Sequence, residues 1–99
     1  MENLDPVIHQ PVRLRICASL TSLNPDDSIE FTFLRDLLEL TDGNLGAHLR
    51  KLEEAGYLTV DKTFVDRKPK SFIAITPRGR TAFKEHVRAL RKIIKQAGS

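Results

Sequence analysis

The stretch that decides the fold is residues 40–58, which read LTDGNLGAHLRKLEEAGYL. Its apolar residues follow the i, i+4, i+7 spacing of one buried helical stripe: Leu45, Leu49 and Leu52. Thr41 is a suitable N-cap, and Gly56 can take the left-handed conformation that ends a helix. The stretch therefore predicts an amphipathic helix over about residues 42–55.

The face of this predicted helix opposite the leucines combines small and basic side chains, with amide and imidazole groups along one flank. Its members are Gly43, Asn44, Ala47, His48, Arg50, Lys51 and Glu54. Such a face near a helix N-terminus suits insertion into the major groove of DNA. A surface helix of any small domain would have a similar face. The segments after residue 56 distinguish a DNA-binding helix from an ordinary surface helix.

Length and composition describe an ordinary globular protein. The chain has 99 residues, of which 40% are apolar and 29% are charged, and we expect one domain over residues 1–99 with a modest core. Residues 1–5 lack the basic start and apolar stretch of a signal peptide, and no apolar run approaches the roughly 20 residues that span a bilayer. We therefore expect a cytoplasmic protein with no membrane partner.

The single cysteine and the three histidines do not suggest a metal site. Cys17 lies in an apolar run and is expected to be a small buried hydrophobe, and no disulfide can form within the chain. The histidines are scattered and show no metal-ligand spacing. We expect neither a metal nor a cofactor.

Positive charge is concentrated in the last third of the sequence. Residues 1–30 and residues 31–61 each carry a net charge of −3, whereas residues 62–99 carry eleven basic and two acidic side chains, a net +9. A basic segment on a small protein is typical of a polyanion-binding surface, although a lysine-rich solvent-facing helix gives the same signal.

Two further helices are predicted before residue 40. Pro11 favours a helix over about 11–23, whose inward residues would be Val12, Ile16, Leu20 and Leu23. Residues 29–31 alternate like a very short strand, and Thr32 is then predicted to cap a helix over about 33–40. The core stripe of that helix would be Leu34, Leu37 and Leu38. Its closeness to the helix over 42–55 fits a helix-turn-helix.

The apolar period changes from helical to alternating after Gly56. Residues 58–64 and 71–76 predict two strands. Between them, residues 65–70 read VDRKPK, a long basic tip where a purely structural hairpin would use a tight Asn-Gly or Asp-Gly turn. Such a tip suits contact with phosphates. Thr76 and Pro77 predict the start of a last helix over about 77–96.

Five short motifs then identify a family. They are HQPVRLRI at 9–16, GNL at 43–45 with HL at 48–49, LEEAGYL at 52–58, RKPK at 67–70 and TPRGR at 76–80. Together, over roughly residues 6–90, the chain resembles the MarR/ArsR-like winged helix-turn-helix transcriptional regulators of the small single-domain bacterial and archaeal type. The resemblance implies an α+β, mainly α fold with a three-helix core, a two- to three-stranded wing and a long C-terminal helix.

The resemblance also implies a sequence-specific DNA-binding regulator. Its recognition helix, about 42–55, would enter the major groove of double-stranded DNA, and a basic wing, about 63–71, would lie on the backbone or in the minor groove. The matching positions are Thr41, Asn44, Ala47, His48, Lys51, Arg67, Lys68 and Lys70, to which charge on the same helical face adds Arg50.

Residue chemistry gives several of these positions a role. Asn44 suits adenine and Ala47 suits a thymine methyl group, whereas the basic residues suit phosphates. His48 suits equally a DNA contact or packing within the domain. Two features depart from the family pattern: Asp42 places negative charge where DNA would approach, and the glycines at 43 and 46 leave fewer side chains for base readout.

The last helix predicts a homodimer. Its apolar residues have the spacing of a coiled-coil seam, with Ile93 beside it: Phe83, Val87, Leu90, Ile94 and Ala97. Phe83 and Val87 could instead pack inside one chain, but the outer residues lie too far along the helix for a domain this small to cover. A dimer over 77–96 would also place two recognition helices in successive major grooves about 34 Å apart. The many basic residues near the seam predict a modest interface.

The main alternative is a winged-helix protein–protein interaction module without DNA binding. Such a module would have no need of Arg67, Lys68 and Lys70 together. An enzyme is not expected, because no nucleophile–base pair, glycine-rich phosphate loop or carboxylate pair is evident. The sequence carries no signal for or against a small-molecule effector.

Overall fold

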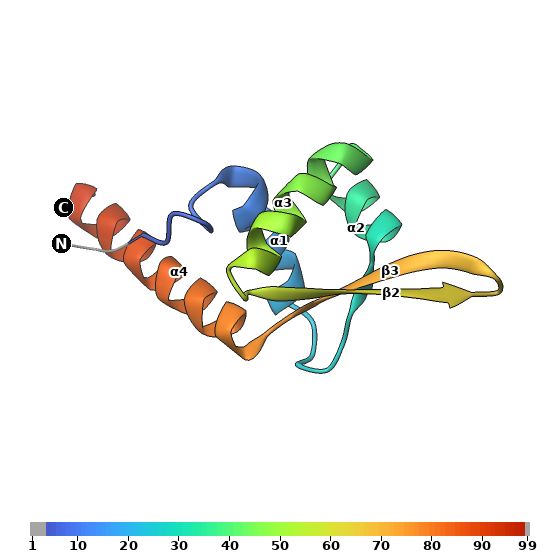
Figure 1. The fold of residues 1–99 in the computed structure, drawn as a ribbon. Coiled ribbons are helices and arrows are strands. Elements are labelled where there is room, and N and C mark those ends of the chain that lie inside the picture. The colour runs from blue at the N-terminus through green and yellow to red at the C-terminus, as the bar shows by residue number, and fades with distance from the viewer. Residues whose placement is uncertain (1–3, 99) are drawn as a thin grey trace.

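The computed structural model describes residues 4–98. The elements in chain order are α1 (Pro11–Thr21), β1 (Ile29–Glu30), α2 (Phe31–Leu37), α3 (Asp42–Glu54), β2 (Leu58–Val65), β3 (Lys68–Ile75) and α4 (Pro77–Ala97). The strands form an antiparallel sheet of order β1-β3-β2. The hairpin of β2 and β3 extends from one side of the helical body, and the end of α4 extends from the other (Figure 1). This is the predicted arrangement of a three-helix core, a hairpin and a long last helix.

The core lies between the first three helices and the base of the hairpin. Its fully buried side chains are Ile8, Ile16, Cys17, Leu20, Leu34, Leu45, Leu52 and Ile73. The predicted leucine stripe of α3 is therefore confirmed. Cys17 is 1% exposed, and desolvation raises the pKa of its thiol to about 12, so it is a protonated, buried group as predicted.

The predicted ends of α3 are also confirmed. The Thr41 side chain accepts a hydrogen bond from the Asn44 backbone N–H at 3.1 Å, which satisfies one of the free donors of the first turn. Gly56 has a φ of 80°, a conformation that side chains with a Cβ rarely adopt. The chain can therefore reverse directly from α3 into β2.

Both earlier helices end sooner than predicted. Helix α1 stops at Thr21 rather than at 23, because the Leu23 N–H bonds only three residues back, to the Leu20 carbonyl. Helix α2 stops at Leu37 rather than at 40, because Glu39 takes a φ of 56°. Leu34 and Leu38 are buried as predicted, but Leu37 is 54% exposed, so its predicted place in the core stripe is wrong.

The predicted start of α2 is also wrong. The helix begins at Phe31, and its N-cap is Glu30. The Thr32 hydroxyl, which was expected to cap the helix, instead donates a hydrogen bond to the Glu30 carboxylate. The helix thus follows β1 without an intervening loop.

The predicted long tip over 65–70 is wrong as well. Strand β2 continues to Val65 and β3 begins at Lys68, so only Asp66 and Arg67 form the turn. Their φ values of 51° and 66° are those of a tight two-residue hairpin turn. An arginine rarely adopts this conformation, which is why the sequence pattern did not indicate it.

A close backbone contact joins α3, the hairpin and α4. The Thr76 N–H donates to the Tyr57 carbonyl at 3.0 Å, and the Thr76 hydroxyl donates to the Gly56 carbonyl at 2.7 Å while accepting from the Gly79 N–H at 3.0 Å. Gly79 lies against the same carbonyl: a Cβ placed on it would be 2.0 Å from the Tyr57 oxygen. Only glycine fits here, so this junction sets how α4 leaves the domain.

We expect Gly79→Ala to destabilise the protein by about 1–3 kcal/mol or more, because the new methyl group overlaps backbone that cannot move aside. Urea unfolding measures the change. The exposed neighbour Thr81 provides the control, since Thr81→Ala should leave stability within about 0.5 kcal/mol. Wild-type stability of Gly79→Ala would contradict the close packing of this junction.

Candidate nucleic-acid interface

The structure places most of the predicted recognition residues together on the outer face of α3. Thr41, Asn44, Ala47, Arg50 and Lys51 are exposed there. Contacts with α1 and α2 fix the orientation of this face of α3.

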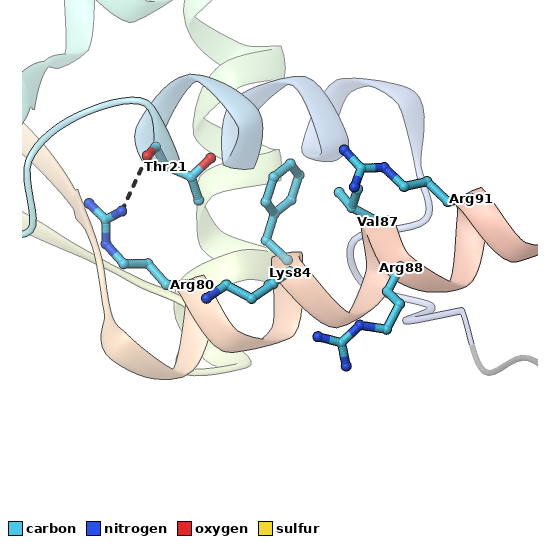
Figure 2. Close-up of a pocket in the computed structure, with 7 residues that line it drawn as sticks. Thr21, Arg80, Lys84, Val87, Arg88 and Arg91 are labelled. Carbon is cyan, nitrogen blue, oxygen red and sulfur yellow. Dashed lines mark hydrogen bonds between the residues drawn. The ribbon is translucent and has the colours of Figure 1, made fainter.

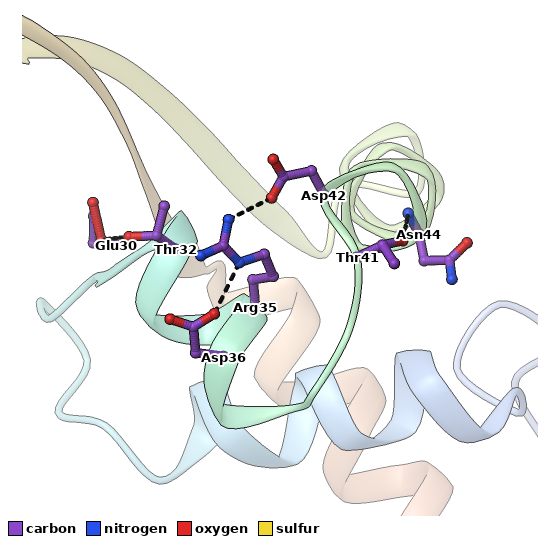
Figure 3. Close-up of polar contacts among 7 residues, drawn as sticks. All are labelled: Glu30, Thr32, Arg35, Asp36, Thr41, Asp42 and Asn44. Carbon is purple, nitrogen blue, oxygen red and sulfur yellow. Dashed lines mark hydrogen bonds and ion pairs between the residues drawn. The ribbon is translucent and has the colours of Figure 1, made fainter.

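An ion pair orders the N-terminus of α3 and offsets the charge of Asp42. Arg35 of α2 donates to the Asp42 carboxylate at 2.8 Å and to Asp36 at 2.9 Å (Figure 3). Hydrogen bonds to Asp36 and then to Asp42 raise the pKa of the guanidinium, which stays charged. The negative charge that departed from the family pattern is thus paired within the chain, at the joint between the two helices of the helix-turn-helix.

His48 contacts the domain itself. Its Nδ1 accepts a hydrogen bond at 3.2 Å from Arg13 of α1, and Arg13 also donates to the Val7 carbonyl. Desolvation and then the Arg13 charge lower the pKa of His48, so the ring is neutral and its proton sits on Nε2. The packing role is therefore present in the structure, and the ring still has one donor for an outside partner.

Two glycines on the exposed part of α3 have no internal reason to be glycine. A Cβ placed on Gly43 or on Gly46 would meet nothing within 4 Å. A glycine inside a helix costs roughly 0.5–1 kcal/mol relative to alanine. No close contact among the described residues therefore requires glycine at these two positions. The backbone there is open to close approach by another molecule.

A groove separates α3 from the hairpin. We call it the α3–hairpin groove; its volume is about 410 Å³, and it is lined by Phe31, Gly46, Leu49, Arg50, Glu53, Val60, Lys62 and Ser71. Arg50 from the helix and Lys62 from β2 bring positive charge to its two sides. Lys62 was missed by the sequence reasoning, because its position depends on which face of the hairpin turns toward α3.

The strand register separates the hairpin cations into two sets. Lys62 lies opposite Ser71 on the face that carries the buried pair Leu58 and Ile75 at the base of the hairpin. Lys68 and Lys70 alternate with that face and lie on the other one. Lys70 is also 3.4 Å from the Glu30 carboxylate, whereas Arg67 and Lys68 are exposed near the turn. Of the predicted wing cations, Lys70 alone has an acidic partner among the ion pairs of residues 4–98.

A second hollow lies between α1 and α4. Its volume is about 450 Å³, and its lining residues are Thr21, Arg80, Phe83, Lys84, Val87, Arg88 and Arg91 (Figure 2). Arg80 closes one end, because its guanidinium donates to the Thr21 carbonyl at 3.2 Å and to the Leu23 carbonyl at 2.9 Å. Phe83 and Val87, two residues of the predicted dimer seam, are thus only partly covered by their own chain.

The N-terminal segment is held by a buried histidine that the sequence reasoning had left without a role. His86 of α4 is 1% exposed, and its Nδ1 accepts from the Asp5 backbone N–H at 3.0 Å. The Asp5 carboxylate in turn accepts from Tyr57, Val7 and Ile8. His86 was missed because a lone histidine on a helix gives no signal of burial.

Comparison with known proteins supplies the family. The family described as "Winged helix DNA-binding domain" matches residues 12–94. The chain belongs to this family. A winged-helix assignment agrees with the helix-turn-helix of α2 and α3 and with the hairpin, which is the wing of the fold.

Archaeal proteins are similar over most of the chain. An uncharacterized protein of Methanocaldococcus jannaschii is 41% identical over 81 residues, which cover 82% of this chain and 85% of that protein. The structure of a transcriptional regulator homologue from Pyrococcus horikoshii is 32% identical with a TM-score of 0.82, covering 92% of this chain and 87% of that one. The transcriptional regulator BldR from Sulfolobus solfataricus shares the fold, with a TM-score of 0.69 at 21% identity over 98% of this chain and 63% of that one.

Residues 4–98 contain neither a membrane-spanning helix nor a cluster of metal-ligating side chains. No helix there is long and apolar enough to cross a membrane. Within the same residues, no three histidine, cysteine, aspartate or glutamate side chains come together to hold a metal ion.

The half-buried His48 and the buried His86 predict a loss of stability in mild acid. Desolvation lowers the pKa of both His48 and His86 below the ordinary value of 6.5, and the charge of His9 lowers that of His86 further. The unfolded chain therefore binds protons that the folded chain does not. Stability should be fully present above about pH 6.5 and should fall as the pH drops through the folded-state pKa values.

Urea unfolding at about pH 7.5 and about pH 5.5 measures this difference. His86→Asn does not titrate, and its Oδ1 lies near the position of the ring Nδ1 that accepts from the Asp5 N–H, so the difference in stability between the two pH values should be smaller in this variant. If the difference in unfolding free energy between the two pH values were the same in wild type and variant, His86 would not contribute to the acid sensitivity.

Proposed function

We propose that this winged-helix protein is a sequence-specific transcriptional regulator that binds double-stranded DNA. The recognition helix α3, within about 42–55, enters the major groove, and the wing, about 63–71, lies on the backbone or in the minor groove. The observation that carries the proposal is the pair of glycines in open space on α3, Gly43 and Gly46. Gly46 lines the α3–hairpin groove, whose charged lining residues are Arg50, Lys62 and the acidic Glu53. The similar P. horikoshii protein, described as a transcriptional regulator homologue, supports the same function.

The contacts follow from residue chemistry and position. Asn44 and Ala47 face outward in the first half of α3, where they can read adenine and a thymine methyl group. Thr41 and the free amides of the first turn suit a phosphate, and His48 can donate from Nε2. The remaining contacts, which position the protein on phosphates, come from Arg50, Lys51, Lys62, Arg67 and Lys68. Lys70 contributes less, because it is paired with Glu30.

Gly46→Ala should separate folding from function. The variant should be more stable by about 0.5–1 kcal/mol, because a helical alanine replaces a glycine in open space. The same methyl group should weaken DNA binding, since it stands where the DNA backbone approaches. Urea unfolding and fluorescence anisotropy with a labelled duplex measure the two effects.

Ser19→Ala on α1 provides the matched control. It also removes a poor helix residue, so it should raise stability slightly and leave DNA affinity unchanged. If Gly46→Ala bound DNA as tightly as wild type, close approach of DNA at Gly46 would be refuted.

The cations of the wing should contribute to the salt dependence of the DNA affinity. Log affinity falls with log salt by about 0.9 for each phosphate contact, and we expect about four to six contacts per subunit. Replacing Arg67 and Lys68 with alanine should flatten this slope and weaken all DNA sequences alike. Lys62→Ala should also flatten the slope, and Lys70→Ala should change it least because of the Glu30 pair. An unchanged slope in the Arg67 and Lys68 double variant would exclude the wing from phosphate binding.

We further propose that α4, over 77–96, joins two copies into a homodimer. The interface would use Phe83, Val87, Leu90, Ile93, Ile94 and Ala97. Phe83, Val87 and Leu90 are half-buried in the single chain, whereas Ile94 is 67% exposed and Ile93 is 37% exposed. The end of α4 extends beyond the helical body, so a second copy would cover this apolar stretch (Figure 1).

Sedimentation of wild type and of a Leu90→Asp/Ile94→Asp variant tests the dimer. Wild type should sediment as a dimer at tens of micromolar (roughly the range of a weak interface), and the variant should sediment as a folded monomer. A wild-type monomer under these conditions would rule out the proposed interface.

A further inference from the structure

The wing carries an aromatic side chain that its own chain leaves in solvent. Phe64 of β2 is 74% exposed, the highest value among the exposed large hydrophobic residues of the described chain. Its partner across the hairpin is Pro69 of β3, which is also exposed. An apolar pair at the end of a rigid hairpin costs solubility and gives the core nothing, which suggests an outside partner.

The register shows which way this pair faces. Residues directly opposite each other in an antiparallel hairpin share a face. Phe64 and Pro69 therefore share the face of Lys62 and Ser71, which line the α3–hairpin groove. The apolar pair extends the α3-facing side of the wing past that groove toward the turn.

The charge around the pair indicates the chemistry of the partner. Lys62 lies two residues before Phe64 on the same face, and Arg67 and Lys68 follow at the turn and the start of β3. Asp66 is the one acidic residue between Lys62 and Lys70. A cationic surface with an apolar centre fits a polyanion whose interior is apolar, as in the minor groove of DNA, where phosphates flank sugars and stacked bases.

We propose that Phe64, backed by Pro69, is a wedge that enters the minor groove beside the recognition site and bends the duplex. The inference rests on the proposed DNA-binding function and adds to it a source of specificity. A ring pressed against a base step favours sequences that unstack easily, which are the pyrimidine–purine steps such as TA. Pro69 suits the backing role because its ring fixes the backbone φ.

The test compares Phe64→Ala, Phe64→Leu and the control Phe33→Ala. Phe33 lies on α2, outside the β2–β3 hairpin, and is 61% exposed, so its replacement removes a comparable exposed ring from another element. Affinity is measured at several salt concentrations on two duplexes of about 30 base pairs, one rich in TA steps and one without them. Energy transfer between dyes on the two ends of each duplex reports the bend.

We expect Phe64→Ala to lose roughly tenfold or more in affinity on the TA-rich duplex, with an unchanged salt slope, because the lost contact carries no charge. The bend should also decrease, Phe64→Leu should fall between Ala and wild type, and Phe33→Ala should behave as wild type. This pattern differs from that of the cation variants, which change the slope.

Three outcomes would overturn the wedge. If Phe64→Ala bound and bent both duplexes as wild type does, the wedge would be refuted while DNA binding stood. If Phe33→Ala lost as much affinity as Phe64→Ala, the effect would not belong to the wing. If wild type bound neither duplex but bound vesicles containing phosphatidylserine through Phe64, both the wedge and the proposed function would fall.

Discussion

The structure depends on the contact of Gly79 with the Tyr57 carbonyl. At this point the end of α3, the two ends of the hairpin and the first turn of α4 share one small space, closed by the hydrogen bonds of Thr76. Because the contact is between backbone atoms, it holds α3, the wing and α4 in one fixed relation. The proposed DNA surface is composed of separate elements and needs such a rigid junction, since a small shift at the base of the hairpin moves its tip much farther.

Most of the fold could be predicted because it follows periodicity and caps. The leucine stripe of α3, the Thr41 cap and Gly56 are local signals, and the structure confirms them. Two of the errors arose where a residue other than glycine takes a positive φ: Glu39 shortens α2, and Asp66 with Arg67 tightens the hairpin turn. The early end of α1 and the start of α2 at Phe31 have other local causes. Burial of His86 and the position of Lys62 in the groove depend on tertiary packing and strand register, which no local pattern contains.

Four residues that weaken the fold lie in α3 or the wing, while Glu39 with its positive φ and the exposed Phe33 and Ile94 lie in other elements. Gly43 and Gly46 reduce helix stability without relieving a contact, Arg67 occupies a conformation that suits glycine, and Phe64 exposes a ring to water. All four belong to α3 or the wing. Natural proteins break local rules mainly where function requires it, so these four residues support an interface on α3 and the wing. Asp42 does not oppose that conclusion, because Arg35 pairs with it.

The central claim, that α3 reads base sequence from the major groove, is tested most directly by selecting bound duplexes from a random pool with wild type and with Asn44→Ala. The account predicts that wild type enriches an inverted repeat whose half-sites lie about 10 base pairs apart, as two symmetry-related helices require. Asn44→Ala should enrich the same repeat without its preference for adenine at one position in each half. Enrichment of no sequence by wild type, or identical preferences in both proteins, would contradict it.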